Sequence, residues 1–311
     1  MYKEEELIIP EKLKKGDLIG VVAPSNPIIG ENIEEIQSAK KIIENLGFKV
    51  KFATNLFSNT NKYSSSAKEK AQDINEMFED KKIKMIWCAK GGENSNSTFE
   101  YLNFELIKQN PKIICGYSDI TSLTNIITQK TGLITYSSTN FKTIATDETD
   151  YSLKQVLSRF VEGNLQLGES EDYKIIQKGR GEGKLIGGNL SLTRALVSGK
   201  YNIDFTDKIL FLEELGFETD PALISNYLYY MKQNEVFKKV KGIWLGNYTH
   251  ESQITLEQIL LDTIGDEFKG PIIKSDNFGH IEKKIVVPIG TKAQIDTAMK
   301  LPIKLLESCV K

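Results

Sequence analysis

"PKIICGYSDITSLTNIITQKTG", residues 111–132, places a serine between an apolar run and a run with helical character. Short apolar runs bounded by turn residues are typical of buried strands. A serine at a strand-to-helix turn exposes its hydroxyl beyond the sheet, and the free N–H groups of the following helix face a developing oxyanion. Ser118 is therefore a candidate nucleophile. From these residues alone, it also fits the N-cap of the helix.

The residues before this stretch repeat the same alternation of strand and helix. Apolar positions at helical spacing predict two helices, and apolar runs rich in β-branched residues predict three further strands. Repeated units of this kind predict an α/β fold with a parallel sheet covered by helices on both faces, whose ligands bind beyond the carboxyl ends of the strands. The predicted strands lie within residues 18–25, 48–54 and 84–90, and the predicted helices within residues 32–47 and 64–80.

Two domains are expected because 311 residues exceed the size at which one core stops growing. Residues 140–180 are polar and acidic, which indicates a connection between domains. Beyond them, short strand-like stretches mix with helical ones, which predicts a second, smaller mixed α+β domain. We place the two domains at residues 1–165 and 166–311.

Charge and composition exclude several classes of function. The 40 Lys and Arg residues nearly balance 42 Asp and Glu residues, without a block of like charge, so neither nucleic acid nor a membrane is the expected partner. The first residues lack the apolar segment of a signal peptide, which predicts a cytoplasmic protein. The three cysteines have no metal-ligand spacing, so we expect no metal site and no disulfide. No GxGxxG loop or GK[ST] motif occurs, and we expect no cofactor.

A serine nucleophile needs a base and a group that orients the base. The two histidines, His250 and His280, each follow or precede a strand-like run, and the residues alone do not separate them. "ILFLEEL" offers Glu213 and Glu214, of which one should point inward from a half-buried strand and need a partner. Gly-Gly in "AKGGENSNS", residues 89–97, allows close backbone approach to a ligand, although such a pair is also an ordinary turn.

Together these segments resemble the serine peptidase family that contains the LD-carboxypeptidases and the microcin C resistance peptidases. The resemblance runs through "KKGDLIGVVAPSNP", the Gly-Gly segment, "GYSDITSL", "KLIGGNLSLTRAL", "ILFLEEL" and "FGHIEKKIVVPIGTKAQID". It implies a flavodoxin-like N-terminal domain that bears the nucleophile, a C-terminal domain that bears the other two catalytic residues, a site in the groove between them, and a homodimer.

The resemblance also implies roles for individual residues. Ser118 is the nucleophile, Glu213 the orienting carboxylate and His280 the general base. The backbone N–H groups of Asp119 and of the glycine loop, Gly91 or Gly92, are implied to form the oxyanion hole.

Two activities occur in this family, and both remain open. One removes a terminal D-amino acid from a murein tetrapeptide, and the other hydrolyses the amide between an aminoacyl or peptidyl group and a nucleotide-like moiety. "GGENSNS" resembles the microcin-resistance form, which favours the second activity and makes Asn94 a candidate substrate contact. Asn189 is a second candidate contact, or else a turn residue. Glu93 and "TYSSTNF", residues 135–141, depart from the family pattern and leave substrate details open. A non-catalytic ligand-binding protein is the alternative from another class.

Overall fold

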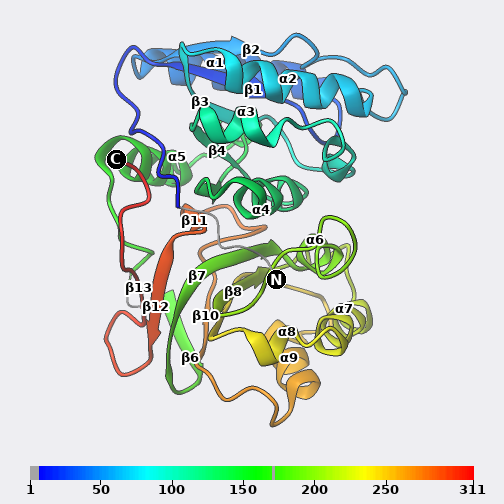
Figure 1. Ribbon diagram of the computed structural model, residues 1–311, viewed down its shortest axis with the longest axis vertical. Helices are drawn as coiled ribbons and strands as arrows, with labels where there is room; N and C mark the ends of the chain where they lie inside the picture. Colours follow the sequence, from blue (N-terminus) through cyan, green and yellow to red (C-terminus); the bar gives the residue numbers. More distant parts are fainter. Residues whose placement is uncertain (1–6, 170–171) are drawn as a thin grey trace.

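The computed structural model describes residues 7–169 and 172–311 and contains two β-sheets (Figure 1). The first sheet has the order β11-β5-β4-β3-β1-β2, in which every pairing is parallel except that of β11 with β5. The predicted α/β fold class, with its parallel sheet, is confirmed. The strands of this sheet are β1 (Leu18–Val22), β2 (Lys49–Phe52), β3 (Ile83–Cys88), β4 (Ile113–Gly116), β5 (Thr135–Ser137) and β11 (Val287–Ile289).

Helices cover both faces of the first sheet because its strands carry apolar side chains on both faces. Val21 and Trp87 pack with the buried residues of α1, whereas Val22 and Ile86 pack with those of α2 and α4. Ser66 and Glu69 form a capping box at the start of α2, which fixes where that helix begins. The helices are α1 (Glu31–Asn45), α2 (Ala67–Glu79), α3 (Phe104–Gln109) and α4 (Ile120–Thr131).

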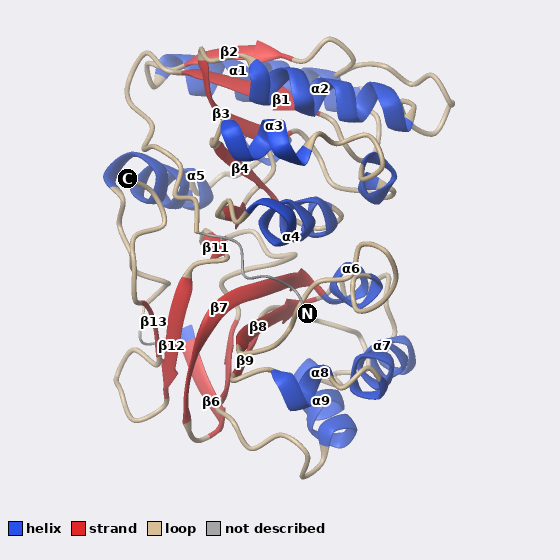
Figure 2. Cartoon of the chain, in the orientation of Figure 1, coloured by secondary structure: helices blue, strands red, loops and turns tan. Residues whose placement is uncertain are grey.

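The second sheet is mixed and has the order β13-β12-β7-β8-β9-β10-β6. Its central strands β7 to β10 are parallel, and the outer strands are antiparallel to their neighbours. Helices α6 to α9 lie together on one side of it (Figure 2). The strands are β6 (Tyr173–Gln177), β7 (Arg180–Asn189), β8 (Lys208–Glu213), β9 (Gly242–Leu245), β10 (Ile272–Ser275), β12 (Lys292–Asp296) and β13 (Ile303–Leu305). The helices are α6 (Leu190–Ala195), α7 (Pro221–Gln233), α8 (Val236–Lys239) and α9 (Leu256–Ile264).

Helix α4 and strand β7 join the two parts of the chain. The side chain of Asn125 donates to the carbonyl of Gly187 at 2.8 Å and accepts from its N–H at 3.0 Å. Gly188, at φ 132°, permits this approach, because a Cβ there would lie 2.6 Å from the hydroxyl oxygen of Thr121. The contact brings the N-terminal half of α4, which follows Ser118, next to the carboxyl end of the second sheet.

Residues 140–180 are more structured than the expected connection. They include a 3₁₀ turn (Phe141–Ala145), helix α5 (Tyr151–Leu157), a π turn (Ser158–Glu162) and strand β6. Buried aromatic side chains hold this segment in place, such as Phe141 against Trp87 and Phe160 against Tyr136. The sequence prediction missed it because the apolar positions are sparse among acidic residues. The domain boundary after residue 165 stays a prediction.

No helix within residues 7–169 and 172–311 is both long and apolar enough to cross a membrane.

Candidate active site

Ser118 lies at the turn between β4 and α4 with a positive φ of 64°. This left-handed conformation is unusual for a residue with a side chain and is the kind of local strain found at functional sites. The helix N-cap is Asp119, and the hydroxyl of Ser118 is directed elsewhere, 3.1 Å from Nε2 of His280. The structure therefore gives Ser118 a different contact from that of a simple N-cap.

His280 links Ser118 to Glu213 across the two halves of the chain. Its Nδ1 lies 2.7 Å from Oε2 of Glu213, and its backbone N–H donates to the same oxygen at 3.0 Å. Glu213 is the last residue of β8 and is only 2% exposed. Gly279, at φ 96°, makes room for this carboxylate, since a Cβ there would lie 2.5 Å from Oε2 of Glu213. The three residues that the family resemblance implied thus form one continuous chain of contacts.

The carboxylates near His280 set its pKa. Burial by itself lowers the pKa of His280, but the charge of Glu213, the hydrogen bond to it and the charge of Glu214 outweigh burial and raise that pKa above its ordinary value. Glu214 is also buried, and burial raises its pKa. Its oxygens accept hydrogen bonds from the side-chain amide of Asn189 and from the backbone N–H groups of Ser191 and Leu215. Glu214 therefore binds these groups instead of the imidazole.

His250, the other candidate base, lies outside this arrangement. Its Nδ1 contacts the hydroxyl of Ser252 in its own exposed loop at 2.8 Å. It does not line the pocket that contains Ser118.

The Gly91–Gly92 segment packs directly against Ser118. A Cβ on Gly91 would lie 2.9 Å from the Cβ of Ser118, and one on Gly92, at φ 133°, would collide with the side chain of Asn26. The backbone N–H groups of Gly91, Gly92 and Asp119 donate to no other residue in the described part of the chain. They are therefore available to an oxyanion, which is the role that the resemblance implied.

Asp119 anchors the turn and the glycine segment together. Its carboxylate, only 1% exposed, accepts from the hydroxyl of Ser25 at 2.6 Å and from the N–H of Ser95 at 2.8 Å. Burial raises the pKa of Asp119 in spite of these hydrogen bonds. The side chain thus links the segments that contain Ser25, Ser95 and Ser118, in addition to the oxyanion-hole role expected for the backbone N–H of Asp119.

A pocket of about 680 Å³ opens from Ser118 and His280 between the two halves of the chain. Its rim carries the exposed carboxylates of Glu93 and Glu218, whereas the one lysine of its lining, Lys200, is paired with Glu100 at 2.7 Å. The other lining residues are Gly92, Asn94, Asn96, Phe99, Asp119, Ser122, Asn189, Ser191, Leu192, Ala195, Leu196, Ser198, Tyr201, Glu214, Leu215 and Thr219.

Asn94 and Asn189 both line this pocket, but each already has protein partners. Asn94 accepts a hydrogen bond from the buried Lys70. Asn189 is the N-cap of α6, and its amide donates to Glu214 at 2.7 Å. Their contact with a substrate stays a prediction.

Sequence reasoning missed Lys284 and Tyr117. The ammonium of Lys284 lies 4.8 Å from the ring centre of Tyr117, and that ring meets the imidazole of His280 edge-on with centres 5.2 Å apart. Lys284 is 4% exposed, and burial lowers its pKa to about 8. In the sequence, the charges of "EKK", residues 282–284, indicate a solvent-exposed segment and not a buried lysine. Only Tyr117, the aromatic residue beside Ser118, is a sequence signal for this stack.

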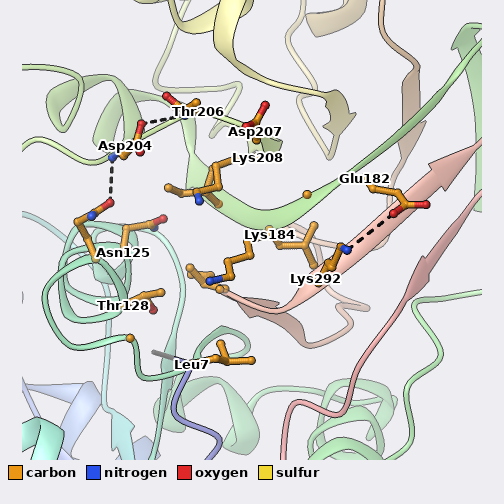
Figure 3. Close-up of a pocket in the computed structure, with 17 residues that line it drawn as sticks. Leu7, Asn125, Thr128, Glu182, Lys184, Asp204, Thr206, Asp207, Lys208 and Lys292 are labelled. Carbon is orange, nitrogen blue, oxygen red and sulfur yellow. Dashed lines mark hydrogen bonds and ion pairs between the residues drawn. The ribbon is translucent and has the colours of Figure 1, made fainter. Parts of the chain in front are cut away.

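A separate cavity of about 560 Å³ lies between α4 and the second sheet and shares no lining residue with the pocket at Ser118 (Figure 3). Several of its charged side chains have partners of their own. Lys292 points toward Glu182, 3.8 Å away, and Asp207 pairs with Lys241. None of the described residues that line it is a serine or a histidine.

Two family models and several named proteins match most of this chain. Residues 19–138 match the model of the LD-carboxypeptidase N-terminal domain, and residues 182–295 match that of the LD-carboxypeptidase C-terminal domain. A Bacillus subtilis protein named "Probable murein peptide carboxypeptidase" is 32% identical, over 94% of this chain and 93% of its own. The microcin C7 self-immunity protein MccF of Escherichia coli is 29% identical, over 95% of each chain.

Solved structures give the same relationship. An MccF-like protein from Bacillus anthracis superposes with a TM-score of 0.86 at 32% identity, covering 97% of this chain and 99% of its own. MccF in complex with glutamyl sulfamoyl guanosine superposes with a TM-score of 0.87 at 25% identity, with the same coverage.

Proposed function

The chain belongs to the LD-carboxypeptidase family and is a serine peptidase, and from that premise we propose that it cleaves an amide bond through an acyl-enzyme formed on Ser118. The family and the enzyme class predicted from the sequence are confirmed. The observation that carries the catalytic proposal is the unbroken contact from the Ser118 hydroxyl through His280 to Glu213, at 3.1 and 2.7 Å.

Each residue has a separate step in the proposed reaction. His280 removes the hydroxyl proton as the Ser118 oxygen attacks the carbonyl carbon, and Glu213 stabilises the imidazolium that results. The N–H groups of Gly91, Gly92 and Asp119 donate to the tetrahedral oxyanion. His280 then protonates the leaving amine, and water, deprotonated by the same imidazole, hydrolyses the ester.

For the substrate, we propose an aminoacyl- or peptidyl-nucleotide of the microcin C type. The "GGENSNS" segment lies at the pocket rim, and MccF, which shares this fold, has been solved with glutamyl sulfamoyl guanosine and with aspartyl sulfamoyl adenosine. The pocket volume of about 680 Å³ lies within the usual range for a ligand of nucleoside size.

The second candidate is LD-carboxypeptidase activity on a murein tetrapeptide. It is favoured by the 32% identity to the Bacillus subtilis relative named as a murein peptide carboxypeptidase. The catalytic steps are the same for both candidates, so only the substrate separates them.

Hydrolysis assays with the two substrate classes test the proposal. We expect release of the amino acid from an aminoacyl sulfamoyl adenosine, or of D-alanine from a murein tetrapeptide, and a fall of several orders of magnitude in Ser118→Ala with unchanged melting temperature. His280→Ala should lose activity similarly, whereas the matched control His250→Ala should keep it. Near-normal hydrolysis by Ser118→Ala would refute the mechanism.

A further inference from the structure

A second, smaller cavity of about 200 Å³ also touches Ser118 and His280. It is below the size usual for a nucleoside or a drug-sized ligand, so it has room for one short side chain or a single small residue. The remaining lining residues are Lys90, Gly91, Gly92, Tyr117, Asn140, Lys142 and Thr143.

Two half-buried lysines give this cavity a positive charge. Lys142 is paired with Glu35 at 2.8 Å, whereas Lys90 makes no ion pair or hydrogen bond with another described residue. One carboxylate against two ammonium groups leaves one positive charge without a counter-ion. Burial, followed by repulsion from Lys142, lowers the pKa of Lys90, and the attraction of Glu35 offsets only part of this lowering.

The backbone holds both lysines beside the nucleophile. Lys90 immediately precedes Gly91, which contacts Ser118, and the backbone N–H of Lys142 donates to the carbonyl of Ala89 at 3.0 Å. Asn140, 4% exposed, accepts from the N–H of Tyr117 through Oδ1, which leaves its NH₂ group as a donor at the same cavity.

The charge of the cleft therefore changes sign at Ser118. The larger pocket carries Glu93 and Glu218, and its lysine is already paired with Glu100. The small cavity carries an uncompensated ammonium. Electrostatic complementarity of this kind fixes the orientation of a charged ligand and excludes the reverse orientation.

We propose that Lys90, supported by Lys142 and Asn140, forms a subsite for a carboxylate that lies within one residue of the scissile amide. The inference rests on the proposed function, because Ser118 defines where the scissile bond lies. Two substrates supply this chemistry: the α-carboxylate of a single leaving residue in a peptide, and the side-chain carboxylate of the acyl residue in an aspartyl or glutamyl nucleotide.

Two matched substrate pairs distinguish these sources. The first pair is a murein tetrapeptide ending in D-alanine and the same peptide with a C-terminal amide. The second pair is glutamyl and glutaminyl sulfamoyl adenosine. We expect the wild-type enzyme to prefer the carboxylate member of one pair, and that pair identifies the source.

Lys90→Met should lower kcat/KM for the preferred carboxylate substrate roughly ten- to hundredfold, the usual value of a charge-assisted hydrogen bond. Its effect on the uncharged member should be small, and Lys90→Arg should retain most of the preference. Lys84→Met, the same change at an exposed position of β3, is the control and should match the wild type.

Equal kcat/KM for both members of each pair in the wild type, or an equal loss on both members in Lys90→Met, would overturn the subsite. If no compound is hydrolysed, calorimetric binding of the same four compounds makes the same comparison. Discrimination in binding without hydrolysis would refute the proposed function alone, and binding without discrimination would refute the subsite.

Discussion

Replacing Glu213 by glutamine tests whether the buried carboxylate stabilises a charged His280. Oε2 of Glu213 lies 2.7 Å from Nδ1 of His280 and accepts a hydrogen bond from the backbone N–H of His280 at 3.0 Å. The side chain of Glu213 is 2% exposed. Glutamine has the same shape and keeps one oxygen for these donors. The substitution therefore removes the charge with little change in packing.

The expected loss of kcat/KM is large because, in the proposed mechanism, the imidazolium forms only during the reaction. With charge centres about 4 Å apart and an effective dielectric constant of about 20, the carboxylate stabilises the imidazolium by about 4 kcal/mol. At about 1.4 kcal/mol per tenfold change, Glu213→Gln should lower kcat/KM by about 10³-fold.

The pH dependence should move as well. In the proposed mechanism, activity needs neutral His280, so kcat/KM should fall as the pH drops through the pKa of this residue. The carboxylates raise that pKa, which places the acidic limb of the wild-type profile above the ordinary value for histidine. Without the charge of Glu213, the pKa of His280 falls and the limb moves to lower pH.

The assay is kcat/KM from pH 4 to 9, with the labelling rate of Ser118 by a fluorophosphonate as a readout that needs no known substrate. Glu214→Gln is the matched comparison, because its carboxylate is equally buried but contacts Asn189 instead of the imidazole. It should shift the limb in the same direction by a smaller amount. A Glu213→Gln enzyme with kcat/KM within tenfold of wild type, or an acidic limb that stays in place or moves to higher pH, would show that the charge of Glu213 does not stabilise the His280 imidazolium.

Two further substitutions have matched controls. Gly279→Ala should slow labelling of Ser118 at least tenfold, because its Cβ would lie 2.5 Å from the Glu213 carboxylate. The control Gly199→Ala, also at positive φ but with open space around it, should label at the wild-type rate. Equal labelling rates in both variants would contradict a steric effect at Gly279. Lys284→Met should move the acidic limb to higher pH, because the buried ammonium lowers the pKa of His280, and the exposed neighbour change Lys283→Met should leave the profile unchanged. A downward shift in Lys284→Met would show that this cation does not act on the imidazole.

The parallel half of the fold followed from the sequence because its signals are local. Apolar runs and helical periodicity predict β1 to β4 and three of their helices. Ile33 fits the helical spacing of α1 but is 40% exposed. Periodicity shows which residues share one face of a helix, but it does not show how far along the helix that face is buried.

Strand β11 shows what local signals miss. It has three residues, lies near the end of the chain, and pairs antiparallel with β5 of the first sheet. Nothing in "VPI" distinguishes a strand of the second sheet from one that returns to the first. That choice is made by tertiary contacts between segments about 150 residues apart in the sequence.

The prediction of the site depended on local sequence signals for one residue and on the family resemblance for the other two. Ser118 was visible from its strand-to-helix context, but the choice of His280 over His250 and of Glu213 over Glu214 depended on family resemblance. In the structure, His280 follows a glycine that fits against Glu213, whereas the carboxylate of Glu214 accepts a hydrogen bond from Asn189. The stack of Lys284 on Tyr117 depends on burial, which a charged sequence conceals.

Mass spectrometry of the fluorophosphonate-treated protein determines whether Ser118 is the nucleophile and whether His280 activates it. We expect a single adduct, on the peptide that contains Ser118, formed rapidly in the wild type and His250→Ala and slowly in His280→Ala. An adduct on another residue, or equal labelling rates in His280→Ala and the wild type, would contradict the proposed mechanism.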